Sequence, residues 1–88
     1  MAVPDFQSFM LPVLRLAANG PLHTAETIAH VSDYFGLSDE DRQERLASGR
    51  QTRVASRVYW TFVHLTKADL LRRESRGVYS ITEKGQQA

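Results

Sequence analysis

Two groups of basic and polar side chains stand close together in the second half of this 88-residue chain. The first group lies within residues 50–57 and consists of Arg50, Gln51, Thr52, Arg53, Ser56 and Arg57. The second lies within residues 72–76 and consists of Arg72, Arg73 and Arg76. Guanidinium groups neutralise phosphates, and Arg and Gln can form paired hydrogen bonds with guanine and adenine edges. Both groups are therefore candidate contacts for duplex DNA.

The distribution of charge along the chain favours a polyanionic partner. The net charge is only +1, but residues 1–49 hold three basic and seven acidic side chains, whereas residues 50–88 hold eight basic and three acidic ones. The basic side chains are thus concentrated in the same half as the candidate site. Such an asymmetry favours nucleic acid as a binding partner.

Composition limits the class of protein. A chain of this length with 42% hydrophobic and 24% charged residues is typical of one small globular domain. It has no cysteine, no apolar run long enough to span a membrane and no signal-peptide pattern at its start. We therefore expect a cytoplasmic location and no membrane partner.

Enzyme chemistry finds little support in the sequence. The three histidines lack metal-ligand spacing, and the five glycines are scattered rather than gathered in a phosphate-binding loop. The acidic run 39–41 follows Ser38, which is typical of a helix start, where the helix dipole favours negative charge. We expect no catalytic residue, no metal ion and no cofactor in this chain.

The elements that must position the candidate site follow from apolar periodicity and cap residues. Helices are predicted from Asp5 to about Ala18, with a kink or a second start at Pro12, and from Thr24 to Phe35. A short helix should begin after Ser38 and extend to about Ala47. Residues 21–23 could supply a short edge strand.

A longer helix, from Thr52 or Arg53 to Ala68 or Asp69, should bury its stripe of apolar residues and turn Arg53, Ser56, Arg57 and Trp60 outward. Strands at 70–74 and 78–82 should then form a hairpin around Ser75-Arg76-Gly77. Helices followed by one hairpin predict a mainly α fold with a C-terminal β-hairpin (α+β), the winged helix-turn-helix. We expect this domain to span residues 1–85, with residues 86–88 starting a linker or marking an arbitrary end.

Several residues have a second interpretation. Arg57 could pair with an acid of the short 39–44 helix instead of a phosphate, and any basic helix face can simply be solvated. Trp60 is expected to pack at the edge of the core, although an exposed role remains open. The interpretation of residues 72–79 as a DNA-contacting wing depends on the basic helix beside them.

Three stretches of the chain resemble the N-terminal domain of Mrr-type restriction endonucleases. They are Ser48-Gly49-Arg50, RVYWTFVHLTKADLL at 57–71 and RGVYSITEKG at 76–85, and the opening from Phe6 to Leu14 around Pro12 is also similar. The resemblance covers nearly the whole chain, but this chain has Asp69 where the family tends to have Gly. That departure affects the turn between helix and hairpin rather than the fold.

The resemblance implies a DNA-binding module that precedes a nuclease domain of the PD-(D/E)xK type in the same polypeptide and acts on modified, typically methylated, DNA. The nuclease motif is missing here, because no acid lies two residues before Lys67 or Lys84. Two other functions stay open: a protein-interaction or homodimerisation module, and a freestanding transcriptional regulator.

Overall fold

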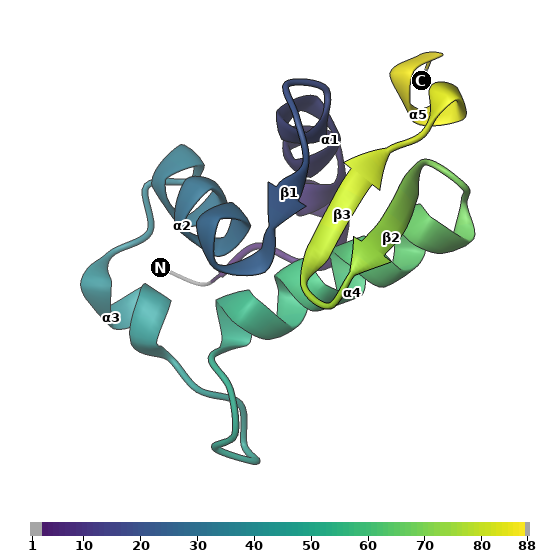
Figure 1. The fold of residues 1–88 in the computed structure, drawn as a ribbon. Coiled ribbons are helices and arrows are strands. Elements are labelled where there is room, and N and C mark those ends of the chain that lie inside the picture. Colours follow the sequence, from purple (N-terminus) through teal and green to yellow (C-terminus); the bar gives the residue numbers. More distant parts are fainter. Residues whose placement is uncertain (1–2, 88) are drawn as a thin grey trace.

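The computed structural model describes residues 3–87 and contains helices and a small sheet in one body (Figure 1). In chain order, the elements are α1 (Phe6–Ala17), β1 (Leu22–His23), α2 (Thr24–Tyr34), α3 (Asp39–Gln43), α4 (Arg53–Lys67), β2 (Leu71–Ser75), β3 (Val78–Ile81) and α5 (Glu83–Gln87). The predicted fold class is confirmed: helices followed by a hairpin, with a three-stranded antiparallel sheet.

The first helix begins where its cap residue predicts. The carboxylate of Asp5 accepts a hydrogen bond from the Ser8 amide at 3.0 Å, which satisfies one of the free donors at the helix start. α1 then continues without interruption through Pro12, so the alternative of a second helix start at Pro12 is wrong.

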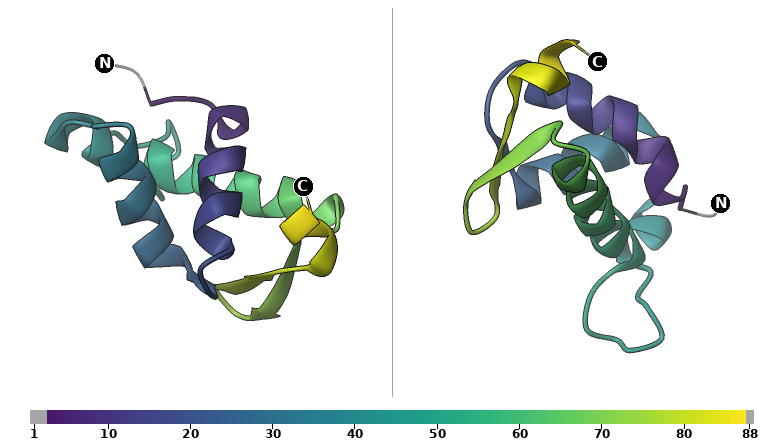
Figure 2. Two further views of the ribbon diagram at one scale, coloured as in Figure 1. Left: turned by 90° about the horizontal axis from the view of Figure 1, so that it is seen from above. Right: turned by 90° about the vertical axis from the view of Figure 1, so that its right-hand side faces the viewer.

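Helices α1, α2 and α4 pack around one apolar core. Fully buried side chains from all three helices meet there, namely Phe9, Val13, Val31, Val54, Val58, Phe62 and Leu65. α1 and α2 both lie across α4 (Figure 2). The core therefore fixes which face of α4 is left outward.

The sheet has the strand order β1-β3-β2, so the hairpin is joined to the body through β1. Leu22 pairs with Tyr79 and His23 pairs with Val78, which confirms the short edge strand considered at residues 21–23. The ring of Tyr79 stacks on Phe62 with centroids 4.3 Å apart, so the sheet also packs on α4. The hairpin consequently stands beside α4, and α4 lies between it and the start of α1 (Figure 2).

The short third helix is shorter than predicted. α3 ends at Gln43 rather than near Ala47, because the chain then turns into a hairpin-like loop over residues 44–52. Arg45 and Thr52 form a β-bridge there, and the Leu46 amide donates to the Gln51 carbonyl at 3.1 Å. This loop projects beyond the start of α4 (Figure 1).

The turn from α4 to the wing uses the residue that departs from the family pattern. Asp69 has φ 63°, in the left-handed region that Gly adopts most easily. Its carbonyl accepts a hydrogen bond from the Thr82 hydroxyl, which joins this turn to the end of the hairpin. The chain therefore forms this turn with Asp in a conformation that Gly adopts more easily.

The C-terminal segment is also more ordered than its sequence suggests. Residues 83–87 carry no apolar pattern in the sequence, yet they form α5, and Gly85 is buried. A Cβ atom on Gly85 would lie 2.2 Å from the Leu70 carbonyl oxygen. Only Gly permits this close approach of α5 to the start of the hairpin.

Candidate nucleic-acid interface

The N-terminal end of α4 holds the first group of candidate residues, and most of them contact the protein itself. Thr52 is the helix cap: its hydroxyl accepts a hydrogen bond from the Ala55 amide at 3.2 Å. Ser56 is only 7% exposed. Ser56 lies opposite the buried stripe of α4 as predicted, but its low exposure contradicts the prediction that it is open to a partner.

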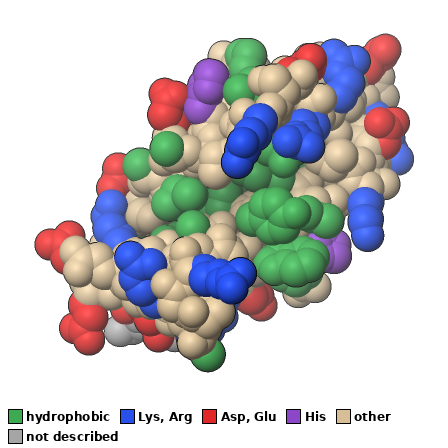
Figure 3. All heavy atoms as spheres, turned by 60° about the horizontal axis from the view of Figure 1, so that its bottom comes forward, with side chains coloured by type: hydrophobic (Ala, Val, Ile, Leu, Met, Phe, Trp, Pro, Cys, Tyr) green, Lys and Arg blue, Asp and Glu red, His purple; other side chains and the backbone are tan. Residues whose placement is uncertain are grey.

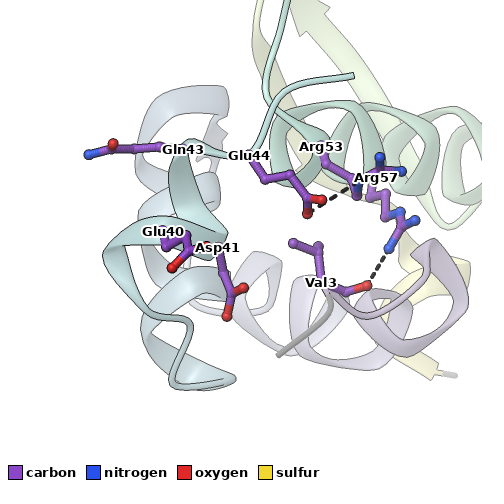
Figure 4. A pocket seen from close by; sticks show the side chains of 7 residues that line it. All are labelled: Val3, Glu40, Asp41, Gln43, Glu44, Arg53 and Arg57. Carbon is purple, nitrogen blue, oxygen red and sulfur yellow. Dashed lines mark hydrogen bonds and ion pairs between the residues drawn. The ribbon is translucent and has the colours of Figure 1, made fainter. Parts of the chain in front are cut away.

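Arg57 is used to hold the segment that precedes α1. Its Nη1 donates hydrogen bonds to the carbonyl oxygens of Val3 and Pro4, the latter at 3.0 Å (Figure 4). Neither predicted role, a phosphate contact or an ion pair with an acid of α3, describes this arrangement. With these bonds in place, Arg57 lies half-buried and pointing away from the outward face of α4.

Arg53 forms an ion pair with Glu44, the residue that follows α3. The Nε of Arg53 lies 3.3 Å from Oε1 of Glu44, and both side chains remain partly exposed. They line a hollow together with Arg57 and the acids Glu40 and Asp41 (Figure 4). The acidic face of α3 thus offsets positive charge at the start of α4.

The loop between α3 and α4 carries the exposed members of the first group. Arg50 and Gln51 are both exposed, and Gly49 provides the left-handed turn with φ 72°. Within residues 3–87, the Arg50 side chain has no ion pair with a carboxylate. Arg50 is therefore available to an external anion.

On the hairpin, the three arginines divide between the two faces of the sheet. Arg72 pairs with Glu74 on the same strand, with Nη2 3.0 Å from Oε1. Arg73 pairs in register with Tyr79, whose ring stacks on Phe62, so Arg73 lies on the face that is turned toward α4. Arg76 is exposed at the tip, next to Gly77 with φ 76°.

The wing tip is held against the body of the domain. Both the amide and the hydroxyl of Thr24, at the start of α2, donate to the Gly77 carbonyl, at 3.0 and 3.1 Å. This anchor fixes the position of Arg76 relative to the helices. The wing is therefore attached to the domain at its tip as well as at its base, which limits the movement of its basic side chains.

The outward face of α4 carries an aromatic pair, of which Trp60 but not Tyr59 was singled out from the sequence. Tyr59 and Trp60 are 52% and 50% exposed, so Trp60 takes the exposed alternative left open by the sequence rather than the favoured place at the core edge. Their rings meet edge to face with centroids 5.8 Å apart. The position of Trp60 opposite the apolar stripe was the available signal. Figure 3 shows hydrophobic side chains in the middle of this face, with Lys and Arg side chains on either side.

The outward surface thus differs from the single band of arginines that the sequence suggested. We define the open face as Arg50, Tyr59, Trp60, Arg73 and Arg76, which are all exposed. Among residues 3–87, the side chains of its three arginines have no carboxylate partner, whereas Arg53, Arg57 and Arg72 contact their own chain. Across the same residues, there is no cluster of side chains suited to a metal ion, and no helix is long and apolar enough to cross a membrane.

Comparison with known proteins identifies the family. The family model described as the Mrr N-terminal domain matches residues 6–88. The chain belongs to the Mrr N-terminal domain family. Its resemblance to that family, read from the three stretches above, is confirmed.

A curated relative of this Mrr N-terminal domain is a restriction enzyme. The chain is 34% identical over 87 residues to the type IV methyl-directed restriction enzyme EcoKMrr of Escherichia coli (strain K12). The match covers 97% of this chain but only 28% of that enzyme, which is therefore much longer. No solved structure gives a significant match.

Proposed function

We propose that this chain is the DNA-binding module of a restriction enzyme that acts on methylated DNA, and that it meets duplex DNA with the open face. The observation that carries the proposal is the pairing of two features. The chain belongs to the Mrr N-terminal domain family, and its outward α4 surface is bordered by arginines that have no carboxylate partner within residues 3–87.

The geometry suits a helix, α4, that approaches a groove of the DNA while the wing and the 44–52 loop contact the phosphate backbone. Arg73 and Arg76 extend from the wing on one side of α4, and Arg50 extends from the 44–52 loop near its start. Guanidinium groups in these positions would bind phosphates, which fixes the orientation of a protein on the duplex. The Thr24 anchor at Gly77 would hold the wing arginines at a constant distance from α4.

In this proposal, the chain binds but does not cut. Cleavage belongs to a nuclease domain elsewhere in the same polypeptide, since metal-dependent hydrolysis of DNA needs clustered carboxylates to hold the ion. EcoKMrr is named as a restriction enzyme, and this chain corresponds to 28% of its length. Homodimerisation is retained as a prediction.

The test is the salt dependence of binding to a fluorescently labelled duplex, measured by anisotropy with the 88-residue chain. Three phosphate contacts predict a slope of about −2.7 in log K against log salt. The Arg15→Ala variant serves as a control that removes one positive charge outside the open face. Arg15 is exposed on α1, where it lines a pocket with His30 and Tyr34. Undetectable binding at low salt, or an affinity that does not change with salt, would contradict the proposal.

A further inference from the structure

The residues that α4 itself presents to solvent are not those expected of a helix that reads bases by hydrogen bonds. Of the candidate residues on α4 and at its cap, Thr52 caps the helix, Arg53 pairs with Glu44 and Ser56 is buried. The exposed Gln51 lies in the loop before the helix. The exposed residues of α4 are instead Tyr59, Trp60, His64, Thr66 and Lys67. The first two lie at the middle of the helix, and both are aromatic.

The aromatic pair occupies the centre of the outward surface. Phe62, one turn after Tyr59, stacks on Tyr79 of the wing, so Tyr59 lies toward the wing side of α4. His64, one turn after Trp60, stacks on Phe6 with centroids 4.4 Å apart, so Trp60 lies toward α1. The pair therefore spans the width of the helix between its two neighbours.

Charge complementarity indicates the partner of this apolar centre. Arginines border it, and the hydrophobic side chains in Figure 3 have Lys and Arg on either side. A phosphate backbone would be drawn to the arginines, which would bring a groove of the duplex against the aromatic rings. The apolar feature that base edges display in the major groove is the methyl group at C5 of a pyrimidine.

We propose that Tyr59 and Trp60 are the specificity-determining residues of this domain and that they contact pyrimidine C5-methyl groups in the major groove. The inference rests on the proposed function, because it assigns roles within the open face. The arginines supply affinity for any duplex, and the aromatic pair supplies the preference among duplexes. The methyl group can come from thymine or from 5-methylcytosine, which share this chemistry.

The experiment compares duplexes of one sequence that differ only in the methyl group. One pair carries thymine or uracil, and a second pair carries 5-methylcytosine or cytosine, with binding measured by competition. The wild-type chain should prefer the methylated member of at least one pair by about threefold to tenfold, the range expected for burying one methyl group. The pair that shows the preference identifies the source of the methyl group.

The double variant Tyr59→Ser/Trp60→Ser should lose this preference while keeping the slope of affinity against salt. Both residues are about half exposed, so their replacement leaves the core intact. The Tyr34→Ser variant is the matched control, since Tyr34 is a 58% exposed aromatic residue on α2, outside the open face, and it should keep the preference.

Three results would overturn the inference. The wild-type chain could bind all four duplexes equally, or the double variant could retain the preference. In the third, the double variant would convert a dimer to a monomer with no change in DNA selectivity, which would assign the pair to a contact between chains. All three results can be obtained only if the chain binds DNA. They are therefore distinct from failure of the proposed function, in which the chain binds no duplex.

Discussion

Two regions beside α4, a closed end at its start and an open end on the wing, use the same residue type in opposite ways. At the start of the helix, Arg53 pairs with Glu44, and Arg57 donates to the carbonyls of Val3 and Pro4. Beside its middle, Arg73 and Arg76 stand on the wing with no carboxylate partner within residues 3–87. The first end is closed by its own chain, and the second is open.

The difference shows that the neighbours of an arginine decide its role. An arginine that already donates to carbonyl groups of its own chain would have to give up those hydrogen bonds to reach a phosphate. One that is solvated gives up only water and counterions, and the release of counterions from DNA favours binding. The closed end therefore contributes to folding, and the open end is left to contribute to affinity.

Removing the open arginines should have the largest effect. The triple variant Arg50→Ala/Arg73→Ala/Arg76→Ala should weaken DNA binding by about a hundredfold or more at low salt, because three phosphate contacts are lost. The slope of log K against log salt should fall by about 2.7 in magnitude. Anisotropy titrations over a salt series measure both quantities.

Thermal unfolding of the triple variant provides the control. All three side chains are exposed and none has an ion pair within residues 3–87, so the midpoint should stay close to that of the wild type. A variant that keeps wild-type affinity would show that the open face is not where DNA binds.

The next largest effect is expected at the closed end, on stability rather than on binding. Arg57→Ala should lower the free energy of unfolding by about 2 kcal/mol, because two carbonyl oxygens lose a charged donor. Urea denaturation measures this change. DNA affinity should change much less than in the triple variant when binding is measured well below the unfolding midpoint. Unchanged stability together with lost binding would move Arg57 to the interface.

A smaller effect should follow from releasing the arginines that are paired. Glu44→Gln and Glu74→Gln remove the carboxylates that lie 3.3 Å from Arg53 and 3.0 Å from Arg72. Each should strengthen DNA binding by about twofold to fivefold at low salt and less at high salt, as expected for exposed charges.

Glu26→Gln is the matched control for this pair of variants. Glu26 is an exposed acid that lines a separate pocket with Asn19 and His30, so its change should have a weaker effect than the other two. Equal strengthening by all three variants would indicate an effect of net charge alone.

The smallest effect concerns the turn that joins α4 to the wing. Asp69→Gly should raise the free energy of unfolding by about 0.5 kcal/mol, because Gly adopts the observed φ of 63° without the steric cost that Asp meets. The backbone carbonyl that accepts from Thr82 is kept. Thermal denaturation checks this, and a decrease in stability would mean that the Asp69 side chain contributes more than its backbone strain costs.

Local signals predicted the fold well. Asp5, Ser38 and Thr52 cap the three helices that they were expected to begin, and Gly77 lies in the hairpin turn. The short β1 strand was identified only as an option, since two residues form a strand only when β3 is beside them. The early end of α3 goes with the bridge between Arg45 and Thr52, and the burial of Gly85 depends on its close approach to Leu70.

The site was harder to predict for the same reason. The partners of Arg57 lie more than fifty residues away in sequence, at Val3 and Pro4. Spacing along α4 also placed Ser56 outward, but the packing at the helix start buries it. The exposed state of Trp60 was indicated by its place on the helix, although aromatic residues usually favour the core.

Trp60 offers the most direct test of the open face, because it is the only tryptophan in the chain and lies at the centre of that face. The measurement is its fluorescence, with and without iodide as quencher, while a duplex is titrated at low salt and binding is followed in parallel by anisotropy. We predict that Trp60 emission changes in step with binding and that iodide quenches the bound form less. Saturated DNA binding with unchanged emission and unchanged quenching would show that DNA contacts another surface.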